Sequence, residues 1–230
     1  MVYSHVFFDL DRTLWDFDFN SHESLMEICE KYNLKKRGVL DYDRFISIYK
    51  VHNLKLWDLY KLDKISQKDL RRERFQRTLS DFKINDFQLS EDIGEEYIEV
   101  CPRKNKLFPY AITVLDYLKE KYQLHIITNG FDKTQHIKLE HSNLKHFFNQ
   151  IITSEKTGFK KPNPKIFEHA LELANAKKSE SIYIGDDLLV DIIGCQSSGI
   201  DGMYFNPLMN PHDENVSYEI SCLSQIMEIL

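Results

Sequence analysis

Val2-Tyr-Ser-His-Val-Phe-Phe8 is an apolar run, and Asp9-Leu-Asp11-Arg-Thr13 follows it directly. Such a run predicts a buried strand, which would place two carboxylates and a hydroxyl just beyond its carboxyl end. Ligands of open α/β sheets bind at that edge. Because side chains alternate along an extended chain, Asp9 and Asp11 should point to the same side, close enough to share a cation or a substrate. A solvated acidic turn is the plainer interpretation, and the later segments of the chain distinguish between the two.

The composition is that of a globular protein. The chain has 230 residues, of which 42% are hydrophobic and 29% charged, and its formal net charge is −6. The acidic balance argues against nucleic acid or an anionic membrane as a partner. No run approaches the ~20 apolar residues of a membrane-spanning helix. We expect a cytoplasmic protein, because the first residues lack a secretion signal and the four cysteines are scattered without a close pair. We also expect a monomer or a homodimer.

The chain from residue 107 onward alternates between helix-like and strand-like patterns. Apolar residues at helical spacing predict helices around 111–118, 133–140 and 166–174. Short apolar runs predict four strands, at 123–127, 150–153, 181–184 and 202–205. Alternation of this kind builds βαβ units, whose strands form a parallel sheet. We therefore expect an α/β fold with a Rossmann-like, doubly wound parallel sheet and helices on both of its faces.

Residues 16–106 differ from the rest, because strand-like runs and glycines nearly vanish and charged residues interleave with helical apolar spacings. An apolar stripe runs along the first part of this segment, and Asn20 and Glu23 are placed like a capping box at its start. We expect an all-α helical cap domain at 16–106, inserted into a catalytic core made of 1–15 and 107–230. An insertion after the first strand should lie over the carboxyl edge of the sheet, where it can act as a lid.

Three further polar segments follow predicted strands or begin a predicted helix. They are Thr128-Asn129-Gly130, Lys161-Pro-Asn-Pro164 and Gly185-Asp-Asp-Leu-Leu-Val-Asp191. In the second segment, Asn163 is placed as an N-cap and the following proline as the first helical residue. The position before a proline disfavours helical geometry, which fixes the Lys161 ammonium at a stiff helix entrance. Carboxylates, a hydroxyl and an ammonium should therefore converge on one edge of the sheet.

The charges of these groups predict a metal ion. Two like charges about 4 Å apart repel by roughly 4 kcal/mol at an effective dielectric constant of 20. Asp9, Asp11 and Asp186 therefore cannot cluster in ionised form without a cation, and an all-oxygen ligand set favours Mg²⁺ over zinc. Lys161 and Thr128 remain available for an anion, and phosphate suits both the metal and the helix entrance.

In order and spacing, these segments resemble the motifs of the haloacid dehalogenase-like (HAD) hydrolase superfamily of phosphatases and phosphotransferases. The likeness covers Asp-x-Asp-x-Thr at Asp9–Thr13, Thr128–Gly130, Lys161-Pro162, and Gly-Asp-x4-Asp at Gly185–Asp191. Each motif is weak alone, but four in sequence, each in its expected strand or loop context, are specific. The long helical insertion after the first motif looks like the cap of the type-one capped branch.

The resemblance implies a catalytic role for three residues. Asp9 would be the nucleophile that attacks phosphorus and becomes an aspartyl-phosphate. Asp11 would protonate the departing alkoxide and then deprotonate the water that cleaves the intermediate. Lys161 would neutralise charge on both Asp9 and the phosphate. Phosphoryl transfer relies on such positioning and shielding of charge.

The resemblance also implies ligand contacts for the remaining motif residues. Phosphoryl oxygens would be held by the loop of Thr128, Asn129 and Gly130, together with Lys161. Mg²⁺ would be bound by the Asp9 carboxylate, the Asp11 backbone carbonyl and Asp186, with Asp191 as a ligand or an indirect partner.

Arg12 departs from the commonest family pattern, because glycine often stands at this position. We expect an exposed side chain beside the site, and a contact with substrate or cap is the alternative. The resemblance leaves Asp187 without a defined role. Asp11 argues against the dehalogenase activity that names the superfamily, because a halide leaving group needs no protonation.

In the helical segment, Asp18, Asn53 and Arg74 are our candidates for polar groups that face the substrate. The stretch from Asn53 to Tyr60 is similar to caps of the nucleotidase-like branch. Aromatic residues here could stack on a nucleobase, but such side chains more often fill a small helical core. The aromatic candidates are Trp15, Phe17, Phe19, Trp57, Tyr60 and Phe75.

We therefore expect a Mg²⁺-dependent phosphomonoesterase that hydrolyses a small phosphorylated metabolite, with nucleoside 5'-monophosphates as the best candidates. A phosphomutase or other phosphotransferase on sugar phosphates is the alternative among enzymes, because acceptor choice depends on how the cap excludes water. A phospho-acceptor module resembling response-regulator receiver domains, and a core kept only as a scaffold, are the alternatives outside catalysis. The helical insertion disfavours the first and the intact catalytic set disfavours the second.

Overall fold

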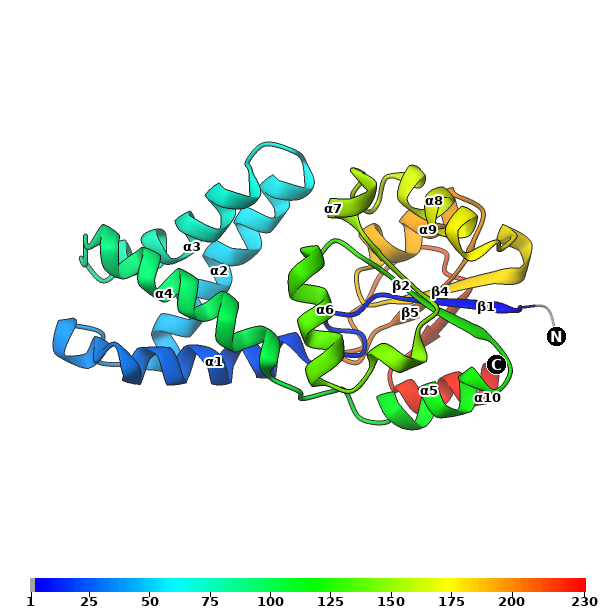
Figure 1. The fold of residues 1–230 in the computed structure, drawn as a ribbon, viewed down its shortest axis with the longest axis horizontal. Coiled ribbons are helices and arrows are strands. Elements are labelled where there is room, and N and C mark those ends of the chain that lie inside the picture. Colours follow the sequence, from blue (N-terminus) through cyan, green and yellow to red (C-terminus); the bar gives the residue numbers. More distant parts are fainter. Residues whose placement is uncertain (1–2) are drawn as a thin grey trace. The chain divides into compact units, whose positions relative to one another are not determined.

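The computed structural model describes residues 3–230, which divide into two compact units (Figure 1). The core unit consists of the chain up to Phe17 and of Asn105–Leu230, and the helical unit is Asp18–Lys104. The beginning of the first predicted strand, at Val2, lies outside the described residues. Within the described residues, every helix is too short or too polar to cross a membrane.

The core unit contains a sheet of six parallel strands in the order β3-β2-β1-β4-β5-β6. The strands are β1 (His5–Phe8), β2 (Gln123–Thr128), β3 (Gln150–Thr153), β4 (Ser181–Gly185), β5 (Asp201–Phe205) and β6 (Tyr218–Ile220). The four strands predicted after residue 107 are confirmed to within one residue at each end. The last strand was not predicted, because its three residues are too few to show a periodic pattern.

Helices cover both faces of this sheet, as the alternating pattern predicted (Figure 1). One face carries α5 (Ala111–Lys119) and α10 (Ile226–Ile229), and the other carries α8 (Pro164–Ala174) and α9 (Gly194–Ser197). The remaining elements include α6 (Asp132–His141), α7 (Ser154–Thr157) and a π-helical turn at Leu188–Ile193. With both faces covered, all four residues of β1 are buried, which explains why this strand is a continuous apolar run.

The core beneath α8 is built from apolar side chains of the strands and of the covering helices. Phe7 of β1 and Tyr183 of β4 are fully buried there, and the rings of Phe167 and Tyr183 meet edge to face at 5.5 Å. The entrance of α8 is as predicted, because the Asn163 side chain accepts a hydrogen bond from the Lys165 amide at 3.0 Å. This rigid entrance carries Lys161 to the carboxyl edge of the sheet.

The helical unit is formed by four helices, of which α1 begins one residue before the unit does. They are α1 (Phe17–Lys31), α2 (Tyr42–Lys61), α3 (Gln67–Asp81) and α4 (Phe87–Val100). Its interior is aromatic: the Tyr49 ring lies 4.9 Å from Phe75 and 5.6 Å from Tyr97. Phe75 is fully buried, so this residue fills the helical core, as the plainer alternative for the aromatic residues expected.

The predicted start of the first helix is wrong. Asn20 and Glu23 do not form a capping box, because α1 already begins at Phe17 and Asn20 lies buried inside its first turns. The Phe17 ring packs beside Trp15 at 6.2 Å, which holds the chain in place three residues earlier than the polar pattern indicated. A true capping box occurs at α3, where Ser66 and Asp69 bond each other's backbone amides.

Candidate active site

Asp9 stands at the carboxyl end of the central strand. β1 lies between β2 and β4, and the chain leaves these two neighbours toward opposite edges of the sheet. This is the switch point at which open α/β sheets bind ligands. The Asp9 amide donates to the carbonyl of Ile184 at 2.9 Å, and the Asp9 side chain is buried. The strand pairing therefore brings the chain segment after β4 next to this carboxylate.

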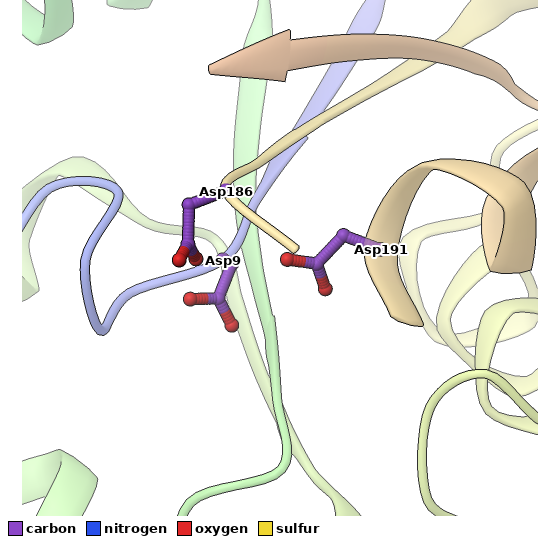
Figure 2. Close-up of side chains that lie close together, drawn as sticks. All are labelled: Asp9, Asp186 and Asp191. Carbon is purple, nitrogen blue, oxygen red and sulfur yellow. The ribbon is translucent and has the colours of Figure 1, made fainter. Parts of the chain in front are cut away.

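Three carboxylates meet at this point (Figure 2). One oxygen from each of Asp9, Asp186 and Asp191 lies within 4.8 Å of the others. Thr13 donates a hydrogen bond to Asp186 at 3.4 Å, so the first motif also orients the last one. Glycine is required at position 185, because a Cβ there would lie 2.5 Å from an oxygen of Asp191. The acidic segments that follow β1 and β4 therefore meet at this sheet edge, as the sequence predicted.

Lys161 is buried among these acids. Its ammonium donates to Asp9 Oδ1 at 2.6 Å, to Asp191 Oδ1 at 2.6 Å and to the Tyr183 hydroxyl at 2.7 Å. All three of its protons therefore have an acceptor. Although burial alone lowers the pKa of the Lys161 ammonium, the charges of Asp191 and Asp9 outweigh it and raise that pKa. The lysine is held as a cation between two carboxylates.

The charge of this cluster is not balanced. Three carboxylates and one ammonium leave a net charge of −2 when all are ionised. Burial raises the pKa of Asp9 to about 7, with Lys161 opposing the shift and the charge of Asp191 adding to it. Burial, followed by the charges of Asp191 and Asp9, raises the pKa of Asp186 well above its usual range. A divalent cation with oxygen ligands fits both the donor set and the missing charge.

Asp191 is the carboxylate least available as a direct ligand. Its Oδ1 accepts hydrogen bonds from Lys161 and, at 3.1 Å, from Tyr183, while its Oδ2 accepts one from the Asp187 amide at 3.2 Å. The Asp187 side chain accepts from the Val190 amide at 3.0 Å and thus begins the π-helical turn. These contacts favour an indirect role for Asp191 and give Asp187 a structural one.

The Thr128-Asn129-Gly130 segment follows β2 at the same sheet edge, but its polar groups are internally paired. The Thr128 hydroxyl accepts from the Gly130 amide at 3.0 Å and lies 3.4 Å from Gln135 Oε1. The Asn129 side chain makes two hydrogen bonds to the backbone of Lys161, at 2.8 and 2.9 Å. Asn129 therefore positions the lysine loop through its side chain, a contact that the sequence did not reveal.

Asp11 does not join the acidic cluster, so the expectation that its carboxylate shares a cation with Asp9 is wrong. Lys138 donates to Asp11 Oδ1 at 2.5 Å, and Gln135 donates to Asp11 Oδ2 at 3.1 Å. A tight loop causes this divergence, because the Arg12 amide bonds the carbonyl of Trp15 and ends the strand-like alternation. The backbone carbonyl of Asp11 remains the predicted metal contact.

Arg12 occupies a backbone conformation that suits glycine. Its φ angle is 66°, in the left-handed region, which explains why glycine is common at this position of the family pattern. The side chain is exposed, as expected, and its guanidinium lies 4.6 Å from the centre of the Phe17 ring. This cation–π contact offsets part of the backbone strain.

The three candidates in the helical unit differ in their surroundings. Asp18 is exposed, and its carboxylate lies 3.7 Å from the Lys50 ammonium. Asn53 and Arg74 are buried, with Asn53 Oδ1 and Arg74 Nε lacking a hydrogen-bond partner within the described residues. The Arg74 guanidinium lies 4.7 Å from the centre of the Tyr97 ring. Two of the three candidates thus combine burial with unused hydrogen-bonding capacity.

Three buried polar residues of the core unit were missed from the sequence: Gln135, Lys138 and Tyr183. Tyr183 stands in an apolar strand, where alternation predicts only packing. Gln135 and Lys138 are three residues apart on α6 and therefore share one helix face. The available sequence signal is that the helix at 132–141, predicted between two strands, has few apolar residues to cover the sheet, so some of its polar side chains must face inward.

Comparison with known proteins supports one family for the whole chain. A family profile described as haloacid dehalogenase-like hydrolase matches residues 6–204. The pyrimidine 5'-nucleotidase PynA of Streptococcus pneumoniae is 32% identical over 237 residues, covering 100% of this chain and 96% of that protein. The pyrimidine 5'-nucleotidase YjjG of Escherichia coli is 28% identical over 233 residues, covering 100% and 99%.

Solved structures agree with the sequence relatives. The HAD-hydrolase YfnB of Bacillus subtilis, in a crystal form bound to magnesium, matches with a TM-score of 0.89. It is 27% identical, and the match covers 100% of this chain and 99% of that chain. A hydrolase family leaves no place for the receiver-like alternative. The matched profile, the full-length relatives and the four motifs gathered at one sheet edge show that this chain belongs to the haloacid dehalogenase-like hydrolase family.

Proposed function

We propose that the protein is a Mg²⁺-dependent phosphomonoesterase that acts through an aspartyl-phosphate on Asp9. The observation that carries the proposal is the cluster of Asp9, Asp186 and Asp191, which is buried, short of positive charge and joined to a single lysine. A buried carboxylate that has a lysine on one side and uncompensated negative charge on the other is suited to attack a phosphate that is presented by a divalent cation.

Asp9, Asp186 and the Asp11 carbonyl would hold the Mg²⁺, with Asp191 supporting the site through Lys161. When bound, the ion would supply the missing positive charge and shield the phosphoryl oxygens. The magnesium in the YfnB crystal form supports this choice of ion.

In the first step, an oxygen of Asp9 attacks phosphorus, and the bond from phosphorus to the leaving oxygen breaks. Asp11 gives its proton to that oxygen, so the product leaves as an alcohol. In the second step, water attacks the same phosphorus, and its proton passes to the Asp11 carboxylate. The bond to Asp9 then breaks, and inorganic phosphate departs. Lys161 keeps the Asp9 carboxylate in place through both steps.

Phosphoryl oxygens would be held by the Thr128 hydroxyl and the amides of Asn129 and Gly130. Binding requires the Thr128 hydroxyl to exchange its present contacts with Gly130 and Gln135 for the ligand. Gly130 lies in the loop after β2 and Gln135 on α6, and rotation of the Thr128 side chain would release both contacts.

Nucleoside 5'-monophosphates, pyrimidine ones first, are the substrates that we propose. Two full-length relatives are named pyrimidine 5'-nucleotidases. In the helical unit, the unpartnered atoms of Asn53 and Arg74 would serve the carbonyl and N–H groups of a base, and Asp18 would serve the sugar. Burying such groups without a partner costs roughly 1–3 kcal/mol each, which a bound ligand would remove.

The test is phosphate release from pyrimidine nucleotides and from p-nitrophenyl phosphate, with and without Mg²⁺. Wild-type protein should require Mg²⁺, and Asp9→Asn should lower kcat by roughly 10³-fold or more, because the nucleophile is lost. Asp116→Asn, which changes an exposed acid of the same unit, should match the wild type. Full activity of Asp9→Asn would refute the mechanism. Adding an alcohol or a sugar to the same assay measures transfer to an acceptor other than water, which is the phosphotransferase alternative.

The cytoplasmic location and the monomeric or homodimeric state stay predictions from the sequence.

A further inference from the structure

The helix α6 of the core unit buries a charged side chain. Among its ten residues, Gln135, Lys138 and Leu139 are the buried ones, and only 4% of the Lys138 side chain is exposed. Lysine is almost never fully buried unless it is paired. Burial of a glutamine and a lysine side chain costs desolvation free energy, so the group that they contact is of functional interest.

That partner is Asp11. Lys138 donates to one oxygen of its carboxylate at 2.5 Å and Gln135 to the other at 3.1 Å, so both oxygens are held from the same helix. Each carboxylate oxygen has two lone pairs and therefore keeps one that can take up a proton or accept a hydrogen bond from water. The clamp formed by Gln135 and Lys138 fixes the direction of the carboxylate without blocking it.

Aromatic rings also contact the Lys138 ammonium. Its ammonium lies 4.3 Å from the centre of the Trp15 ring, which is fully buried, and 5.5 Å from that of Phe17. Aromatic faces attract a cation and leave the donor direction toward Asp11 unchanged.

Gln135 is held through the phosphate-binding segment. Its Oε1 lies 3.4 Å from the Thr128 hydroxyl, while its amide nitrogen reaches Asp11. Gly130 makes room for it, because a Cβ at position 130 would overlap the Gln135 side-chain amide. The glycine of the second motif thus lets one glutamine join the predicted phosphate site to the predicted acid.

We propose that Lys138 and Gln135 are positioning residues that orient the Asp11 carboxylate for proton transfer. This inference rests on the proposed function. The two residues act through Asp11 and not on the substrate, so their loss should affect the chemical steps more than substrate binding.

The test is Lys138→Met, which keeps an unbranched side chain of similar length beside Trp15 and removes the ammonium. We expect kcat to fall about 10- to 100-fold with KM nearly unchanged, because orientation of an acid–base group is worth effects of this size. With p-nitrophenyl phosphate, whose leaving group needs little protonation, the first step should stay fast and the second should slow. A pre-steady-state burst of nitrophenol that is larger than that of the wild type would show that the second step has become slower than the first.

Three further variants separate positioning from simple stabilisation. Lys138→Arg should restore part of kcat, because it keeps a cation over Trp15. Lys133→Met changes an exposed lysine of the same helix and should match the wild type. In an Asp11→Asn background, Lys138→Met should change kcat little further, because a residue that acts through Asp11 has nothing left to orient.

Three outcomes would overturn the inference. An unchanged kcat in Lys138→Met would show that the pair is only structural, even if the melting temperature falls. A rise in KM alone would show direct substrate binding by Lys138. Additive losses in the Asp11→Asn background would show that the lysine acts elsewhere. These outcomes leave the proposed function intact if Asp9→Asn still abolishes activity, whereas a wild type that hydrolyses no phosphate ester removes both.

Discussion

The acidic sheet edge of the core unit and the interior of the helical unit accommodate buried polar side chains in different ways. In the core unit, the strands end at one edge, and the polar groups placed there satisfy each other, as the three acceptors of Lys161 show. In the interior of the helical unit, Asn53 Oδ1 and Arg74 Nε have no hydrogen-bond partner within the described residues, and away from the acidic edge the core unit also contains such an atom, His125 Nδ1. The difference is therefore one between the acidic edge, whose charged groups are paired with each other, and the two candidate residues Asn53 and Arg74, which retain unused hydrogen-bonding capacity.

The largest expected effect is the loss of the central cation from the core unit. Lys161→Met should lower kcat by roughly 10³-fold, because Asp9 loses the group that orients and shields it. It should also destabilise the metal-free protein by about 3–5 kcal/mol, because buried carboxylates are left unpaired. Steady-state kinetics and denaturant unfolding measure the two effects.

Lys160→Met, at the neighbouring position, is the matched control for this substitution and should retain activity. If Lys161→Met kept a wild-type kcat, the preorganised charge cluster would have no catalytic value, and the contrast between the two units would disappear.

The sequence predicts the core unit well for a physical reason. The strands that end at or just before Asp9, Thr128 and Asp186 are parallel, so their carboxyl ends must share an edge, and local patterns suffice to find them. The three short motifs were thus found at the correct strand ends without knowledge of the strand order.

What escaped prediction depends on side chains that meet across the fold. Asp11 turns toward α6 because of a tight loop, and no pattern in the sequence links it to Lys138, which is 127 residues away. In the helical unit, the helical character was evident, but which polar residue faces inward depends on how the helices pack. Asn20 illustrates this: asparagine is a residue type that often caps helices, but here it lies buried within α1.

A smaller effect concerns the stability of the core unit in mild acid. Burial lowers the pKa of His125 to about 4, and the charge of neighbouring His5 adds to the shift. The folded state therefore resists a proton that the unfolded chain accepts below the ordinary pKa of about 6.5. The contribution of neutral His125 to the free energy of unfolding should be fully present above that pH. It should fall by about 2–3 kcal/mol as the pH drops from 6.5 to 4. Urea unfolding across this range measures it.

His125→Phe preserves the stacking on Phe7, which lies 4.6 Å away, and cannot titrate. Its unfolding free energy should lack this decline. The difference between the two proteins isolates the histidine from Asp9, whose raised pKa acts in the opposite direction because protonation then favours the folded state. Hydrogen exchange should place the acid-sensitive opening in the core unit, and equal opening of the helical unit would contradict this origin.

The smallest expected effect tests recognition by the helical unit. Arg74→Met keeps the packing against Tyr97 and removes the guanidinium, whose Nε has no partner within the described residues. If the group is reserved for a base, kcat/KM for pyrimidine monophosphates should fall about 10-fold, which is the value of one charge-assisted hydrogen bond. The loss for p-nitrophenyl phosphate, which has no base, should be much smaller. Arg77→Met, on the same helix and paired with Glu73 at the surface, is the control and should leave both substrates unaffected. An equal loss for both substrates would mean that Arg74 serves the stability of the helical unit, and its unpartnered atom would then be a cost of packing with no role in recognition.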